Sequence, residues 1–190
     1  MGLLPEDGIA RELQRVAFGE EVQAVKIKAL QDVKSIPLGS GKVGPFRKGN
    51  SYQIPLWQAN VLREFNLVDP EETPPLSCSD IQKQVSHEST TQKLGGFQNH
   101  FYLTARSEED VIDAQVKTNL KPKDIAKRFH AYLYDLVQTR LSKLLKLATN
   151  PLSKTTLQEI PEEEQLLLTR LSKLIRDWTS FLLNAENSER

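Results

Sequence analysis

The chain has 190 residues, 25 basic and 25 acidic side chains, and a hydrophobic share of 38%. This length suits one domain of ordinary size, or a medium domain that carries a small one. The formal net charge of zero disfavours a dedicated nucleic-acid module, because such modules usually carry a basic excess. The single cysteine, Cys78, excludes an intramolecular disulfide and a cysteine-rich metal site. This cysteine usage favours a reducing compartment.

No targeting or membrane segment is expected. The N-terminal run Met1–Asp7 lacks a basic stretch followed by a long apolar one, which a signal peptide requires. The longest unbroken apolar runs contain only a few residues, far fewer than a membrane-spanning helix needs. We therefore expect no membrane partner.

The first third of the chain predicts a short helix followed by β structure. Apolar residues in Ile9–Phe18 have helical spacing. Three short stretches with β character follow, and a glycine-rich turn at residues 39–45 separates the second from the third. These stretches are Val22–Ile27, Val33–Ile36 and Tyr52–Ile54.

Pro55 predicts the start of a helix of about three turns that ends near Asn66, because a proline at the first helical position loses no needed N–H bond. We expect Trp57 to be a buried anchor between this helix and the strands. Residues 69–75 combine prolines with acids and predict a linker. The predicted organisation is a small β-rich domain at 1–69, a linker at 70–78 and a helical domain at 79–190.

The remainder of the chain predicts helices. Ser107 has an acid three residues later and then apolar residues, the pattern of a capped helix start. The predicted helices are Ile81–Leu94, one that begins at Ser107, a long one from Pro122 to Asn150 and a last one opened by Pro161. Phe97–Ala105 is predicted to be either a short helix or an extended connection. The predicted fold class is mainly α with a small N-terminal β domain (α+β), and a helical, bundle-like C-terminal domain.

The glycine turn gives only a weak indication of nucleotide binding. Gly39–Gly44 matches G-x-G-x-x-G, but that fingerprint needs a helix at the glycines, and Pro45 and Gly49 follow instead. A P-loop needs Ser or Thr after Lys42, where the chain has Val43. A glycine turn in a β element is favoured, and a nucleotide-binding enzyme using this turn remains the alternative.

No other pattern points to catalysis. The three histidines, His87, His100 and His130, form no closely spaced pair, and no zinc or nucleophile signature is present. Ordinary polar or partly buried histidines are the favoured interpretation. We therefore expect no catalytic residue, no metal and no cofactor.

The long helix carries a basic side, which favours a solvated face. Phosphate contacts require only positive charge along a groove, so a weak DNA-tracking surface stays open, as does a free-standing nucleic-acid adaptor. The basic residues are Lys121, Lys123, Lys127, Arg128, Arg140, Lys143 and Lys146.

The last helix carries an apolar stripe at near-heptad spacing: Leu167, Leu171, Leu174, Trp178 and Phe181. It predicts either a core face against the long helix or an interface with another chain. Apolar residues cover more of each helix than one antiparallel neighbour needs, so we expect some of this surface to meet another subunit. Trp178 and Phe181 are the expected anchors, and the chain is not expected to be a stable monomer.

Residues Ile36–Leu62 resemble the small β domain of GINS complex subunits, of the type that carries this domain first and the helical domain second. The residues that carry the resemblance are Pro37, Leu38, Gly44, Pro45, Phe46, Gly49, Ile54, Pro55, Leu56, Trp57, Ala59 and Leu62. Thr156–Ile160, before the last helix, is also similar. The proline-rich linker and residues 81–98 match nothing in that family.

The resemblance implies a scaffold subunit without an active site. It implies a hetero-tetramer formed through the helical domains, with a sister subunit of opposite domain order. It further implies an MCM helicase ring and a RecJ-like protein as partners in the replicative helicase, with DNA contacted indirectly or weakly. The compact linker suggests an archaeal version, which would act in the cytoplasm; a eukaryotic one would be nuclear.

Overall fold

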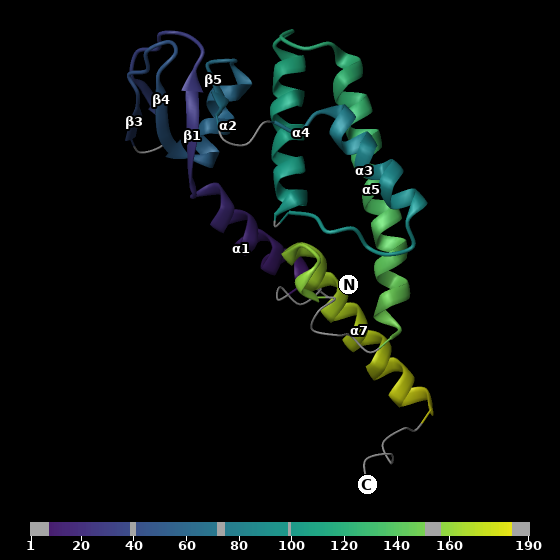
Figure 1. Ribbon diagram of the computed structural model, residues 1–190. Helices are drawn as coiled ribbons and strands as arrows, with labels where there is room; N and C mark the ends of the chain where they lie inside the picture. Colours follow the sequence, from purple (N-terminus) through teal and green to yellow (C-terminus); the bar gives the residue numbers. More distant parts are fainter. Residues whose placement is uncertain (1–7, 39–40, 72–74, 99, 151–156, 184–190) are drawn as a thin grey trace, which may run out of the picture.

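The computed structural model describes residues 8–38, 41–71, 75–98, 100–150 and 157–183 (Figure 1). Its strands all lie in the first part of the chain, and helices form most of the rest, so the predicted α+β class is confirmed. Within the described residues, no helix has both the length and the apolarity that a membrane crossing requires. The helices are α1 (Ile9–Glu21), α2 (Leu56–Glu64), α3 (Cys78–Thr90), α4 (Phe101–Lys117), α5 (Lys123–Ala148) and α7 (Glu162–Leu183).

The small β part contains a three-stranded antiparallel sheet with the order β4-β1-β5. Its centre is β1, where Ile27 lies opposite Tyr52 of β4 and Ala29 lies opposite Val68 of β5. A separate hairpin pairs β2 with β3, and a bridge between Val33 and Phe46 extends it. The strands are β1 (Ala24–Ala29), β2 (Ile36–Leu38), β3 (Gly41–Val43), β4 (Ser51–Pro55) and β5 (Val68–Pro70).

Helix α2 closes the core of the β part. Alternate residues of β1 point to one face, so Ile27 and Ala29 are buried there against Ala59 and Leu62 of α2. Phe46 completes this core and packs edge-on against Tyr52, with ring centroids 4.9 Å apart. The same period of two leaves Lys28 of β1 exposed on the opposite face.

The helical part is built around the long helix α5. Helix α3 and helix α4 both pack against α5, and α7 packs against its C-terminal half (Figure 1). One core cluster joins Ile81 of α3, Ile112 of α4 and Phe129 of α5. A second cluster joins Leu144 of α5 to Leu168 of α7.

Three boundaries differ from those predicted. Ser107 does not begin a helix, because α4 already starts at Phe101 and runs through it. Strand β5 lies where the predicted linker begins, since its residues complete the sheet by pairing with β1. Helix α3 starts earlier than predicted, at a capping box in which Ser77 and Asp80 bond each other's backbone N–H groups.

A buried ion pair connects the β part to the helical part. Arg63 of α2 donates to Glu108 of α4 at 2.5 Å, and both side chains are at most 10% exposed. Two further bonds flank it: Asn60 donates to the Ser107 hydroxyl, and Gln115 donates to the Arg63 carbonyl, both at 2.6 Å. The two parts are therefore joined by tertiary contacts as well as by the chain between them.

Candidate interaction surfaces

A buried charge cluster, here called the Arg140 cluster, lies at the centre of the helical part. Arg140 is 1% exposed and donates to both oxygens of Glu164, at 2.8 and 2.5 Å, and to Glu88 at 2.9 Å. Lys143 donates to the other oxygen of Glu88, and Tyr102 donates to Glu164, both at 2.5 Å. The Arg140 cluster therefore connects α3, α4, α5 and α7.

At Glu88 and Arg140, hydrogen bonds and neighbouring charges together shift the pKa more than burial does. Burial opposes the charged form of Glu88, but the bond from Lys143 and the charge of Arg140 lower its pKa. Burial likewise opposes the charge on Arg140, and its bonds to Glu164 raise its pKa. Burial and the Glu164 carboxylate raise the pKa of Tyr102. Glu88 and Arg140 are therefore held in their charged forms, and the Arg140 cluster acts as an internal tie.

The predicted basic side of α5 is partly wrong. Arg140 and Lys143 point into the protein and bind carboxylates, because Glu88 and Glu164 from other helices meet them there. Arg128 is exposed but pairs with Asp124 one turn earlier, at 2.5 Å. Arg128 and Lys146 lie near opposite ends of α5, about five turns apart, so the remaining basic residues are spread along the helix. Of these, Lys123, Lys127 and Lys146 are exposed, and Lys121 is half-buried.

The largest group of exposed apolar residues among the described elements lies on α7. Leu174 is 66% exposed, Trp178 64% and Phe181 81%, and Leu182 and Leu183 are also exposed. The other two residues of the predicted stripe, Leu167 and Leu171, pack partly against the core cluster of Leu144 and Leu168. The stripe therefore begins inside the helical part and becomes free towards the end of α7.

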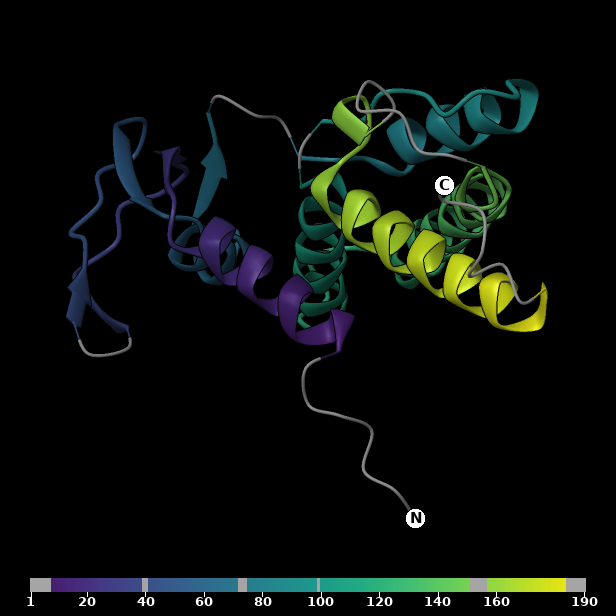
Figure 2. The same cartoon turned by 90° about the horizontal axis from the view of Figure 1, so that it is seen from below.

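An apolar groove of about 600 Å³, here called the α1–α7 groove, continues from the buried end of this stripe. Helix α1 forms one wall and approaches α7, where Glu12 forms an ion pair with Arg170 (Figure 2). No residue of α1 is buried, although its apolar side faces the groove. The apolar lining includes Ile9, Leu13, Leu103, Val137, Leu141 and Leu167.

The described residues around the glycine turn lack the geometry of a nucleotide site. Residues 36–43 include both strands of the β2–β3 hairpin, and the next described element after it is strand β4, where the fingerprint requires a helix. Gly39 and Ser40 themselves lie outside the described residues. Gly44 has φ of +93° and Gly49 has φ of +84°, so both glycines serve turns that L side chains rarely adopt. The nucleotide-binding alternative is therefore not supported by the fold.

The three histidines lie in separate places. His100 binds Glu20 of α1 at 3.0 Å, His130 binds Glu109 of α4 at 2.6 Å, and His87 is exposed on α3. Among the residues that the structure describes, no group of three His, Cys, Asp or Glu side chains is arranged to hold a metal ion.

The residues that carry the family resemblance have different structural roles. Phe46 is in the core of the β part, and Gly44 precedes it through a cis peptide bond to Pro45. Pro55 ends β4 and caps α2. Trp57 is only half-buried, so the expectation of a buried anchor is wrong: Ala59 and Leu62 on the other side of α2 fill the core instead. Pro37 is exposed in β2, Leu38 ends that strand, and Leu56 is half-buried.

Comparison with known proteins agrees with this architecture. Residues 12–66, from α1 to the end of α2, match the family described as the PSF2 N-terminal domain. The chain is also 26% identical over 99 residues to the "Probable DNA replication complex GINS protein PSF2" of Caenorhabditis elegans. That alignment covers 50% of this chain and 55% of the relative, so the chain spans about half the length of the curated relative that it matches.

The order of a small β part followed by a helical part, together with these matches, supports the similarity to GINS subunits. The resemblance predicted from the sequence is therefore confirmed. Within that class, the similarity is to PSF2. The archaeal origin expected from the compact linker stays a prediction.

Proposed function

We propose that this chain is a non-catalytic scaffold subunit of a GINS complex that acts in DNA replication. The exposed end of α7 is the observation that carries the proposal. Leu174, Trp178 and Phe181 are each at least 64% exposed, on a helix whose earlier part packs against the core cluster of Leu144 and Leu168. Solvation of so many large apolar side chains is unfavourable, and burial against another subunit removes it.

The partner that fits this surface is a sister GINS subunit. An interface of this kind buries roughly 2,000 Å² or more, with a few aromatic and leucine anchors at its centre. The α1–α7 groove and the α7 stripe share Leu167, and the stripe carries exposed apolar residues as far as Phe181. Through such an assembly the chain would support the MCM helicase and a RecJ-like partner on the chromosome.

The test is assembly with a co-expressed sister subunit, measured by light scattering. The variant combines Trp178→Ala with Phe181→Ala, and circular dichroism follows helix content. We expect wild type to form a complex and the variant to lose it while it keeps its helices. Phe65→Ala is the matched control, because Phe65 is a 57% exposed aromatic residue of the β part. A wild-type chain that stays a monomer with and without the sister subunit would contradict the proposal.

A further inference from the structure

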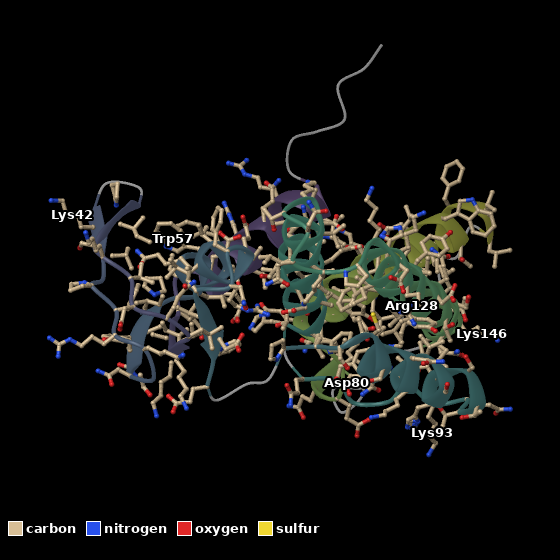
Figure 3. The ribbon with its side chains drawn as sticks, turned by 90° about the horizontal axis from the view of Figure 1, so that it is seen from above. Lys42, Trp57, Asp80, Lys93, Arg128 and Lys146 are labelled. Atoms are coloured by element: carbon tan, nitrogen blue, oxygen red, sulfur yellow. The ribbon has the colours of Figure 1, made fainter. Side chains whose placement is uncertain are left out.

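A second groove, here called the Trp57 groove, lies where α1, α2 and α4 meet. It has a volume of about 560 Å³, and its apolar residues include Phe18 of α1 and Trp57 and Val61 of α2. Phe18 is 66% exposed and Trp57 is half-buried, although both are large aromatic side chains. The bond between Asn60 and Ser107 fixes α2 against α4 beneath the groove. Figure 3 shows Trp57 in the β part, remote from Lys93 and Lys146 in the helical part.

The rim of the Trp57 groove is acidic. Four acids and one base, Arg106, line it. Glu20 contacts His100 at 3.0 Å and accepts a hydrogen bond from Gln23. Glu21, Glu64 and Asp110 form no ion pair among the described residues. Aromatic side chains therefore lie beside three unpaired negative charges, on three different helices.

We propose that the Trp57 groove binds a basic amphipathic segment of a partner protein. An apolar side chain of that segment would enter between Phe18 and Trp57, as aromatic residues in grooves hold helical peptides. Its Lys or Arg residues would lie near Glu21, Glu64 and Asp110, where complementary charge favours encounter and register. Nucleic acid does not fit, because its phosphates would meet the acidic rim. This site is separate from the α7 stripe and does not depend on the proposed function.

Intrinsic fluorescence provides a direct assay, because the chain has only two tryptophans. Trp178→Phe leaves Trp57 as the reporter in the 190-residue chain. The probe is a tryptophan-free amphipathic peptide of about 15 residues with leucines on one face and lysines on the other. We expect it to shift Trp57 emission to shorter wavelength, with affinity that falls as salt rises. The same peptide with glutamates in place of lysines should bind about tenfold more weakly or not at all.

Charge variants assign the binding to the groove. Combining Glu21→Gln, Glu64→Gln and Asp110→Asn keeps side-chain shape, and we expect the combination to weaken lysine-peptide binding about tenfold. Asp69→Asn is the matched control, because Asp69 is an exposed acid of β5 outside the groove. It should leave affinity unchanged. Circular dichroism confirms that each variant is folded.

Several results would overturn the proposal. Equal affinity for the lysine and glutamate peptides would show that the acidic rim does not attract basic residues. An equal loss from Asp69→Asn would indicate non-specific attraction. Trp57 emission that depends on protein concentration without peptide would indicate a second copy of the chain in the groove. Binding that is retained when Leu174 and Phe181 are also changed to alanine supports the proposal and separates this site from the subunit interface.

Discussion

Replacing Arg140 with methionine tests whether the Arg140 cluster is an internal tie. The guanidinium group donates two bonds to Glu164, one to Glu88 and one to the Gly95 carbonyl, and lies 4.3 Å from the centroid of the Phe97 ring. Without it, Glu164 is left with the Tyr102 hydroxyl as its remaining side-chain donor among the described residues. Removing one partner of a buried ion pair costs about 3–5 kcal/mol, because the other charge stays buried and uncompensated.

That cost is large compared with the 5–15 kcal/mol by which typical domains are stable. Urea denaturation followed by far-ultraviolet circular dichroism measures it. For a denaturant slope of about 2 kcal/mol per molar, the midpoint of Arg140→Met should fall by roughly 2 M. Arg128→Ala is the matched control. Its ion pair with Asp124 is exposed, and such pairs contribute only about 0.3–0.5 kcal/mol.

A double variant separates buried charge from lost packing. If the uncompensated Glu164 carboxylate causes the loss, adding Glu164→Leu to Arg140→Met should recover at least ~1 kcal/mol, since apolar pairs of similar volume often replace buried ion pairs without loss. A single variant no less stable than Arg128→Ala would refute the reasoning. It would mean that water reaches Glu164 in solution.

Three further changes test other contacts. Glu108→Gln should weaken the buried bond from Arg63, lower stability by about 1–3 kcal/mol and reduce amide-exchange protection in α2 and α4 together; protection lost in α2 alone would contradict the tie between the two parts. Folding lowers the pKa of Glu88 from its ordinary value of 4.5, so the ionised Glu88 carboxylate stabilises the fold above that pH. This stabilisation is lost as the pH falls through the lowered pKa. The stability difference between wild type and Glu88→Gln should therefore shrink in acid denaturation curves. Gly49→Ala should cost about 1–2 kcal/mol in thermal unfolding because φ is +84°, whereas Gly41→Ala, at a negative-φ or extended position with free space, should cost less than ~0.5 kcal/mol.

Local patterns were sufficient for much of the secondary structure. Helical spacing predicted α1, α5 and α7. The prolines at 55, 122 and 161 marked the starts of three helices, because a proline at a helix start loses no hydrogen bond that the helix needs. Period-two alternation predicted β1 and β4. The capping box at Ser77 and Asp80 was also readable from the sequence, but the prolines before it favoured a linker.

The failures arose where a local signal competed with a distant partner. Ser107 has the sequence of a helix cap, yet it lies within α4, where its hydroxyl accepts from Asn60 of α2. Strand β5 has little strand propensity and forms because β1 offers it an edge. Trp57 has the hydrophobicity of a core residue, but the rotation of α2 turns Ala59 and Leu62 inward and leaves the indole at a groove.

The sequence by itself determined the fold class, the absence of a disulfide within the chain and the position of the apolar stripe, because composition and periodicity are properties of the chain alone. The exposure of Trp178 and Phe181 was decided by the tertiary structure. Only the tertiary structure decided which charges are solvated. Arg140 and Lys143 follow the same helical spacing as the exposed Lys146, and the sequence gives no sign that Glu88 and Glu164 meet them. Pairing between residues 24 to 55 positions apart depends on how helices pack, and packing is fixed only when the whole core forms.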